Sequence, residues 1–208
     1  MRVISVIQGS EEWERLRARP TASQFHRICT PAKGQFAASA IDYAGDILAK
    51  RAGIWVEPPP SYWMEWGVEH EAEAKAAYTA YTGSEVVDAG FIMPDHTDAY
   101  GGSPDGLVPT DGILEAKCPS PQKLFAWHIR YGRDNTYFPL EHRAQCQGLL
   151  WISGRAWLDF WAWHPGMKPL LLQVEPNLEY HKRLEACMDQ MRALLDEYHQ
   201  HLLHGDMT

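Results

Sequence analysis

The stretch SPDG at residues 103–106 is followed nine residues after its glycine by EAK at residues 115–117, at the end of a short apolar run. Side chains alternate between the two faces of a β-strand, so Glu115 and Lys117 are expected on the same face. The residues Thr-Asp-Gly at 110–112 predict a turn between the two motifs. The spacing therefore predicts a hairpin that folds the first motif back against the strand carrying the second.

Asp105 and Glu115 would then converge on one divalent metal ion, with Lys117 beside it. Two carboxylates suit Mg²⁺, which keeps coordination positions for water and phosphate oxygens. Such a metal lowers the pKa of bound water and neutralises charge on a phosphate. Lys117 would orient the attacking water, or help deprotonate it if its own pKa were depressed. The alternative is a surface Asp before an ordinary amphipathic strand.

A third acidic side chain is expected from the segment 61–81, which is rich in helix-forming Glu and Ala. A helix packed on the sheet would bring Glu71 to the metal site. The alternative for Glu71 and its neighbours Glu69 and Glu73 is a solvated helix face.

An acidic residue, a gap of about ten residues and Glu-x-Lys form the signature of the PD-(D/E)xK nuclease core. Several blocks in order make the chain resemble the phage lambda exonuclease family, also called YqaJ-type viral recombinases, from about Gln8 to Tyr198. These blocks are Trp13-Glu14-Arg15-Leu16-Arg17 with Thr21-Ala22-Ser23, Trp66-Gly67 with Glu71, Ser103-Pro104-Asp105-Gly106, Leu114-Glu115-Ala116-Lys117-Cys118-Pro119, and Ala144-Gln145-Cys146-Gln147 with Leu150-Trp151.

The resemblance implies roles for individual residues. It makes Asp105, Glu115 and the backbone carbonyl of Ala116 metal ligands, and it makes Lys117 the catalytic lysine. It places Glu71 at a second metal or its water, and it places Gln147 near the water or the scissile phosphate. Two Mg²⁺ ions per active site are implied, with Mn²⁺ as a substitute.

The same resemblance implies a pocket for a terminal 5′-phosphate, made by Arg17, Ser23 and Ser103. The planar fork of an arginine suits phosphate, and Ser23 could cap the next helix, whose amides attract anions. Lys33, in the polar loop at 31–35, would lie near the DNA entrance. A plain surface arginine and a plain surface loop are the alternatives.

One departure concerns the stretch Tyr-Trp-Met-Glu at 62–65. Some relatives carry a basic residue here, near the scissile strand, whereas this chain has none. Either another residue supplies that contact or an aromatic ring stacks on the DNA.

By resemblance, the protein is an alkaline-type 5′→3′ exonuclease on linear double-stranded DNA. It would release 5′-mononucleotides and leave a 3′ single strand for phage-type recombination. The family also implies a ring-shaped homotrimer and a single-strand annealing protein as partner. The alternatives are a structure- or sequence-specific endonuclease on the same core and a non-catalytic DNA-end-binding module.

Composition is consistent with one domain spanning residues 1–208. No segment is typical of a transmembrane span or a signal peptide, so we expect a cytoplasmic protein without membrane contact. Four scattered cysteines argue against a zinc or iron–sulfur site.

The net charge of −8 is unevenly distributed along the chain. Residues 1–55 hold 8 Lys/Arg against 5 Asp/Glu, whereas residues 56–172 hold 8 against 15 and residues 173–208 hold 3 against 7. The basic N-terminal region is therefore the expected DNA-facing surface. The alternative is that the net charge simply describes a soluble cytosolic protein.

The predicted fold is α/β, a restriction-endonuclease-like core with a central mixed sheet flanked by helices. Residues 156–164 carry bulky side chains at both alternating positions, which indicates a strand covered on both faces and tryptophans that serve the core rather than base stacking. We expect helices at 10–19, 21–30, 38–52, 61–81, 121–130, 140–152 and 177–203, and strands at 85–93, 99–102, 113–117, 156–164 and 170–174.

Overall fold

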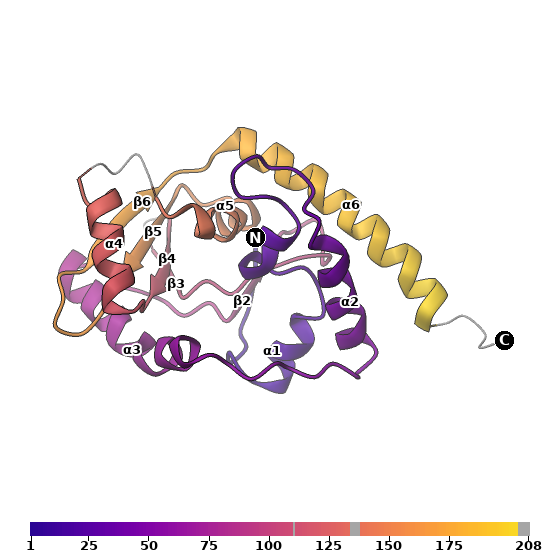
Figure 1. Cartoon of the computed structure of the whole chain (residues 1–208), viewed down its shortest axis with the longest axis horizontal. Coiled ribbons are helices and arrows are strands. Elements are labelled where there is room, and N and C mark those ends of the chain that lie inside the picture. The colour runs from indigo at the N-terminus through magenta and orange to yellow at the C-terminus, as the bar shows by residue number, and fades with distance from the viewer. Residues whose placement is uncertain (110, 134–137, 204–208) are drawn as a thin grey trace.

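The computed structural model describes residues 1–109, 111–133 and 138–203, and it has the predicted α/β architecture (Figure 1). The central sheet contains, in spatial order, β3 (Gly106–Val108), β4 (Gly112–Lys117), β5 (Trp157–Ala162) and β6 (Leu170–Val174). A separate ribbon pairs β1 (Arg2–Ile4) with β2 (Phe91–Met93). The helices are α1 (Glu11–Leu16), the 3₁₀ helix η1 (Ala22–Arg27), α2 (Ala40–Arg51), α3 (Tyr62–Thr82), α4 (Pro121–Tyr131), the 3₁₀ turn η2 (Leu140–His142), α5 (Arg143–Ser153) and α6 (Leu178–Leu203).

The sheet is mixed, as predicted. β3 runs antiparallel to β4, β4 parallel to β5, and β5 antiparallel to β6. A parallel pair needs a long crossover connection, and the chain between β4 and β5 supplies it with α4 and α5. The predicted hairpin at the start of the sheet is confirmed, and Asp111 takes a left-handed backbone with φ of 69° in its turn. Thr110, the first residue of the predicted turn, lies outside the described residues.

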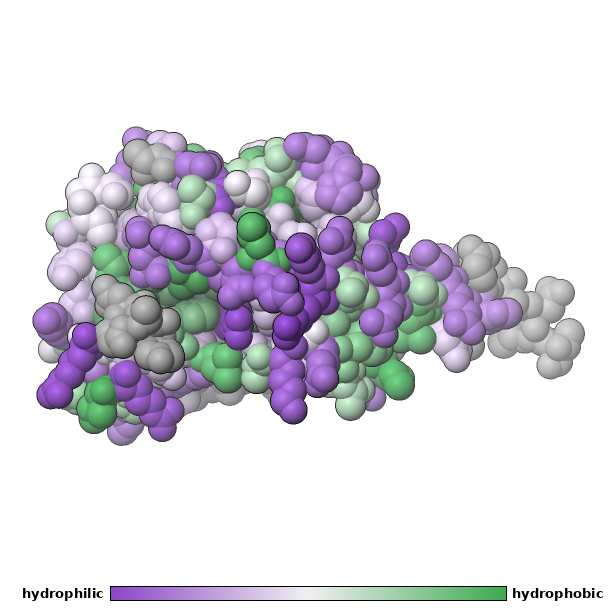
Figure 2. All heavy atoms as spheres, turned by 90° about the horizontal axis from the view of Figure 1, so that it is seen from above, coloured by the Kyte–Doolittle hydropathy of each residue, from purple (hydrophilic) through white to green (hydrophobic). Residues whose placement is uncertain are grey.

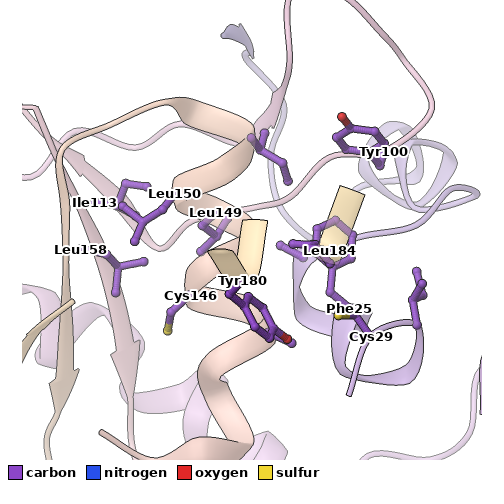
Figure 3. Close-up of a cluster of buried hydrophobic side chains, with 14 of the residues drawn as sticks. Phe25, Cys29, Tyr100, Ile113, Cys146, Leu149, Leu150, Leu158, Tyr180 and Leu184 are labelled. Carbon is purple, nitrogen blue, oxygen red and sulfur yellow. The ribbon is translucent and has the colours of Figure 1, made fainter. Parts of the chain in front are cut away.

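Both faces of the sheet are covered. On β5, Leu158 and Phe160 belong to the large core on the side of α5, whereas Trp161 belongs to a smaller core under α3. The large core joins the sheet to α5, η1 and α6 (Figure 3). The prediction of a doubly covered strand with core tryptophans is therefore confirmed for Trp161, which is fully buried.

A buried polar pair fastens α3 to the sheet. The Tyr78 hydroxyl donates a 2.7 Å hydrogen bond to Asp159, and the Trp161 indole N–H donates one of 2.9 Å to the carbonyl of Ala74. Ala74 and Tyr78 are themselves fully buried. These contacts fix the rotation of α3 about its axis, and hence the direction in which Glu71, two turns before Tyr78, projects.

Several predicted boundaries are wrong. The segment 21–30 forms only the short 3₁₀ helix η1, and its N-cap residue is Thr21, so Ser23 caps no helix. Tertiary pairing overrides helix formation here, because Thr21 makes a parallel bridge to Gly101. The first helix is capped by Ser10 as expected, but it ends at Leu16. It therefore stops before Arg19, the residue at which Pro20 disfavours a helical backbone.

The strands predicted at 85–93 and 99–102 are also largely absent. Only Phe91–Met93 is a strand in the first segment, and the second contributes isolated bridges at Gly101 and Gly102. Gly90, with φ of 63°, breaks the first segment, and a side chain there would collide with the backbone of residues 4–6.

The long C-terminal helix α6 begins after Asn177, whose side chain accepts a 2.8 Å hydrogen bond from the amide of Tyr180. It packs on α2 and α5. Figure 2 shows hydrophilic side chains gathered along its outer face. Within the described ranges, no helix combines the length and apolarity needed to cross a membrane.

Candidate active site

The β3–β4 hairpin brings the two sequence motifs together at one end of the sheet. Strand pairing ends where Gly106 lies opposite Leu114, so Asp105 and Ala116 lie just beyond the last pair. There the Asp105 carboxylate accepts a 2.6 Å hydrogen bond from the Ala116 amide. A residue's N–H and C=O point to the same side of an extended strand, so the Ala116 carbonyl also faces Asp105. This orientation is the one that the predicted carbonyl ligand requires.

Glu115 and Lys117 share a face of β4, as strand alternation predicts. The Lys117 ammonium contacts one carboxylate oxygen of Glu115. The side chain of Glu115 is 1% exposed, and its other oxygen, Oε2, is buried without a hydrogen-bond partner in the described ranges of the chain. A buried carboxylate oxygen without a partner is costly and calls for an explanation such as a bound ion or water.

The three groups shift one another's pKa values. Burial raises the pKa of Asp105, and the charge of Glu115 raises it further, to about 8. Burial likewise raises the pKa of Glu115, against the opposing effect of Lys117. For Lys117, burial favours the neutral form, but the carboxylates of Glu115 and Asp105 outweigh it and raise the pKa. A lysine held in its charged form is suited to orienting a water or a phosphate and not to abstracting a proton.

The structure corrects the glutamine predicted from the sequence. Gln145, not Gln147, contacts the carboxylates: its amide donates a 2.5 Å hydrogen bond to Glu115. Two residues apart on a helix means roughly opposite faces. Gln147 is buried, donates to the Glu175 carbonyl, and accepts from the amide of Asn177. Its contacts hold the start of α6, so the predicted place of Gln147 at the active site is wrong. Gln145 lies in the same sequence block, and only the helix rotation, set by tertiary packing, distinguishes the two.

Glu71 opens onto the same cavity as the hairpin residues. The cavity has a volume of about 570 Å³, and Glu71, Asp105, Ala116 and Lys117 line it. Glu71 also pairs with Lys75, one turn later on α3, at 2.9 Å. A second hollow of about 830 Å³ lies on the other side of Glu71, where Trp13 and Pro104 line it. Glu71 thus stands between two recesses.

Two of the predicted phosphate-binding residues meet around Trp13. Its indole N–H donates a 2.7 Å hydrogen bond to the hydroxyl of Ser103, two residues before Asp105. The Arg17 guanidinium lies over the Trp13 ring, 4.4 Å from the centroid, and pairs with Glu14 at 3.1 Å. Arg17 and Ser103 are therefore linked through one tryptophan beside the β3–β4 hairpin.

Ser23 and Lys33, the other two residues predicted to contact phosphate or DNA, have different surroundings. Ser23 is exposed and lies 3.5 Å from the hydroxyl of Thr21. Lys33 is exposed in the loop before α2, where its carbonyl accepts a 2.9 Å hydrogen bond from Arg183 of α6. Lys33 therefore lies beside the C-terminal helix, on a different part of the surface from the Trp13 cluster.

The donor set fits a hard divalent cation. Glu115 is buried and Asp105 half-buried, and the pKa values of both are raised by removal from water and, for Asp105, by the charge of Glu115. Among the described residues, Glu115 Oε2 has no hydrogen-bond partner. A cation would relieve both conditions. Within the part of the chain that the structure describes, no three His, Cys, Asp or Glu side chains gather closely enough to hold a metal alone. Mg²⁺ commonly binds one or two carboxylates and completes its shell with water and phosphate, so the two carboxylates and the Ala116 carbonyl suffice.

Comparison with protein families gives one match. The family model described as YqaJ-like viral recombinase domain matches residues 12–156, more than half of the chain. That range includes the β3–β4 hairpin, α3 and α5, and hence both carboxylates, Lys117, Glu71 and Gln145. A comparison with curated protein sequences gives no match.

Solved structures give matches over nearly the whole chain. The alkaline exonuclease LHK-Exo from Laribacter hongkongensis is 27% identical, with a TM-score of 0.81 over 94% of this chain and 97% of that one. LHK-Exo in complex with dAMP matches with a TM-score of 0.80, at 27% identity, over 93% and 96%. A phage-related exonuclease from Haemophilus somnus 129PT is 12% identical, with a TM-score of 0.65 over 86% and 94%, which shows a shared fold.

The raised pKa of Asp105 predicts a pH-dependent loss of stability in metal-free protein. Between the ordinary pKa of about 4 and the folded-state pKa of about 8, Asp105 is ionised in the unfolded chain but protonated in the folded protein. Stability therefore falls as pH rises through this window. Asp105→Asn removes the charge, and we expect it to stabilise the protein at pH 8.5 by about 1–3 kcal/mol, less than 1.4 kcal/mol per pKa unit because neighbours relax. The gain should vanish near pH 4.

Urea unfolding in EDTA at pH 4, 6 and 8.5 measures this difference. Asp42→Asn, at an exposed position on α2, is the matched control and should stay within about 0.5 kcal/mol at each pH. An Asp105→Asn protein that is less stable than the parent at pH 8.5 would contradict the assignment of a repulsive carboxylate pair.

The two glutamines of α5 are expected to differ in what their loss changes. Gln145→Ala removes a contact that orients Glu115, and metal affinity should fall about tenfold with little change in stability. Gln147→Ala leaves buried groups at the start of α6 unpaired, and stability should fall by about 1–3 kcal/mol with metal affinity retained. Mn²⁺ titration calorimetry and urea unfolding measure the two quantities. Equal metal affinities in both variants would contradict the assignment of Gln145.

Proposed function

Because the chain belongs to the YqaJ-like viral recombinase family, we propose that it is a Mg²⁺-dependent exonuclease that degrades one strand of linear double-stranded DNA from the 5′ end. The products are 5′-mononucleotides and a 3′ single strand that serves recombination by strand annealing. The likeness to the alkaline exonuclease LHK-Exo supports the nuclease class. The observation that carries the proposal is the pair of carboxylates Asp105 and Glu115, half-buried and buried, beside Lys117 at a cavity that opens to solvent.

The residues of the β3–β4 hairpin have different roles in the proposed reaction. Asp105, Glu115 and the Ala116 carbonyl would hold Mg²⁺, whose bound form supplies charge neutralisation at the phosphate and a more acidic water. Lys117, charged because of its two carboxylate neighbours, holds the attacking water or a phosphate oxygen in line with the bond to be cut. Gln145 keeps the Glu115 carboxylate in a fixed orientation.

Glu71 would complete the acidic set from α3. Its carboxylate lines the cavity, and its charge raises the pKa values of both Asp105 and Glu115. That electrostatic effect supports its assignment to a second metal or to the water on it. Lys75 orients Glu71 through the ion pair on the same helix.

Recognition of the terminal 5′-phosphate is assigned to Arg17, Ser103 and Ser23. Stacking on Trp13 holds the guanidinium of Arg17 in place, and Trp13 also fixes the hydroxyl of Ser103. Trp13, which contacts both residues, lines the larger of the two hollows beside Glu71. The terminal nucleoside would then span the distance between the phosphate pocket and the metal site.

Family membership also supports a cytoplasmic, ring-shaped homotrimer that works with a single-strand annealing protein, and we include both in the proposal. A ring needs basic charge only where it surrounds DNA. The net charge of −8 and the hydrophilic outer face of α6 (Figure 2) are compatible with an acidic exterior.

The proposed reaction is tested by digesting matched linear and closed-circular duplexes in Mg²⁺. We expect rapid loss of the linear duplex and release of mononucleotides, with the circle intact. Lys117→Ala should lower the rate at least about a thousandfold while DNA binding persists, since it removes a group needed at the reacting phosphate. Gel analysis and acid-soluble nucleotide release give the rates.

Cleavage of the closed circle would replace this proposal with an endonuclease on the same core. Retained DNA binding without cleavage of either substrate would favour an end-binding module. Undiminished activity of Lys117→Ala would exclude Lys117 from the reaction.

A separate prediction concerns the end that the enzyme recognises. Arg17→Ala should reduce the preference for 5′-phosphoryl over 5′-hydroxyl duplexes to less than about threefold, because the charge-assisted contacts are lost. Initial rates on the two substrates measure the preference. Arg15→Ala, two residues earlier on the exposed side of α1, is the matched control and should keep the parental preference. A preference that survives Arg17→Ala would place the phosphate pocket elsewhere.

A further inference from the structure

The two walls of the catalytic cavity differ in chemistry. α3 contributes Trp63 and Met64 on one side, within the stretch that has no Lys or Arg. Both side chains are substantially exposed, at 45% and 62%. Around Trp63 and Met64 this wall is apolar, and the only charged α3 residue lining the cavity is the acidic Glu71, so among the described residues α3 offers no positive charge to a DNA strand lying there.

The opposite wall comes from the first turn of α4 and carries a cation. Ser120, the N-cap of α4, and Lys123 both line the cavity, with Lys117 at its base. The Lys123 ammonium lies 4.9 Å from the centroid of the Trp127 ring, which restrains the side chain by a cation–π contact. Figure 1 shows α3 and α4 beside the sheet, toward the left of the view.

Lys123 is only weakly engaged by acidic groups. It pairs with the carboxylate of Glu141 at 3.7 Å, and both side chains are about half exposed. An exposed pair at that separation contributes little stability. A DNA phosphate, with its two exposed oxygens, can therefore replace the Glu141 carboxylate as the partner of Lys123 at a small cost in free energy.

His142 adds a second polar group on the same wall. It precedes α5, one turn before Gln145, and lines the cavity. Its ring packs edge-on against Trp127, at 5.6 Å between centroids, and its buried Nε2 has no hydrogen-bond partner among the residues that the structure describes. Burial lowers the pKa of His142 to about 3, and the charges of Lys117 and Lys123 act in the same direction. His142 is thus neutral, so it can offer a hydrogen bond but no charge to a phosphate.

Resting on the nuclease function above, we propose that Lys123, with Ser120 and His142 beside it, forms a subsite for the backbone phosphate next to the scissile one on the strand being cut. Lys123 supplies a point charge, Ser120 a hydroxyl donor and His142 a neutral ring nitrogen. The strand would then lie across the cavity, with its phosphates toward α4 and its bases toward Trp63 and Met64.

A charge contact of this kind has a measurable signature. Binding of one phosphate by a lysine releases counterions, so its loss lowers the slope of log affinity against log salt by about 0.7–0.9. We expect Lys123→Gln to weaken binding of a 5′-phosphorylated linear duplex about fivefold to twentyfold at low salt. Fluorescence anisotropy on the Lys117→Ala background measures binding without cleavage.

A duplex with one methylphosphonate linkage next to the scissile phosphate locates the contact. This linkage carries no charge, so the Lys117→Ala protein should bind it about as weakly as the Lys123→Gln variant binds normal DNA. Adding Lys123→Gln should then cost nothing further, because the partner charge is already absent. A methylphosphonate placed several linkages into the duplex should leave the effect of Lys123→Gln unchanged.

Two control variants test whether the loss of binding is specific to the charge of Lys123. Lys182→Gln, at an exposed position on α6, should bind both duplexes like the parent. His142→Phe keeps the ring packing against Trp127 but removes the nitrogen, and we expect a loss of affinity of about threefold without a change in salt slope.

The outcomes are distinguishable. If the parent binds linear duplex and Lys123→Gln binds it equally well, the subsite is wrong and the nuclease function stands. Equal losses on charged and methylphosphonate duplexes would likewise overturn it. A parent that binds no linear duplex would overturn the proposed function and the subsite together.

Discussion

Repulsion between two carboxylates, one buried and one half-buried, is the constraint on which the site depends. Asp105 and Glu115 are brought together where the β3–β4 pairing ends, and burial raises the pKa values of both. A fold does not gain stability from such a pair, and proteins retain unfavourable groups of this kind mainly where function needs them. Lys117 compensates one carboxylate oxygen of Glu115 and leaves the other without a partner. The remaining imbalance is what a divalent cation would remove.

The rest of the chain holds this arrangement rigid. β4 is covered by α3 on one face and by α5 on the other, so the carboxylate of Glu115 cannot turn away into solvent. The Tyr78–Asp159 hydrogen bond fixes α3, and the Gln145–Glu115 hydrogen bond ties α5 to the site directly. A polar group buried with its partner in this way specifies one orientation of the helix, because any other rotation would leave it unpaired. Glu71 and Gln145 therefore reach the hairpin from opposite faces of the sheet.

Prediction from the sequence succeeded where local patterns, the alternation of a strand or the propensity of a helix, determine the structure. Strand alternation placed Glu115 and Lys117 together, and the strong helix formers around Glu71 gave α3 nearly its full length. It failed where tertiary contacts decide: Thr21 bridges Gly101 instead of starting a long helix. The choice between Gln145 and Gln147 failed for a related reason, because both fit the same motif and only the rotation of α5 against β4 separates them. The roles assigned to Arg17 and Ser23 came from resemblance, and no local pattern brings Trp13 between Arg17 and Ser103.

An acidic protein can bind DNA if its charges are arranged locally, and the cavity shows how. The basic surplus of the N-terminal region is largely engaged in ion pairs, such as Arg27 with Asp46 and Arg15 with Glu11. Counting charges along the chain therefore overstates what that region offers to a phosphate. Lys123 comes from the acidic middle of the chain, yet it is restrained by Trp127 at the cavity and only loosely paired. The cations that matter for a strand in the cavity are thus those held by aromatic rings beside the carboxylates, where the field of a bound metal ion would add to their own.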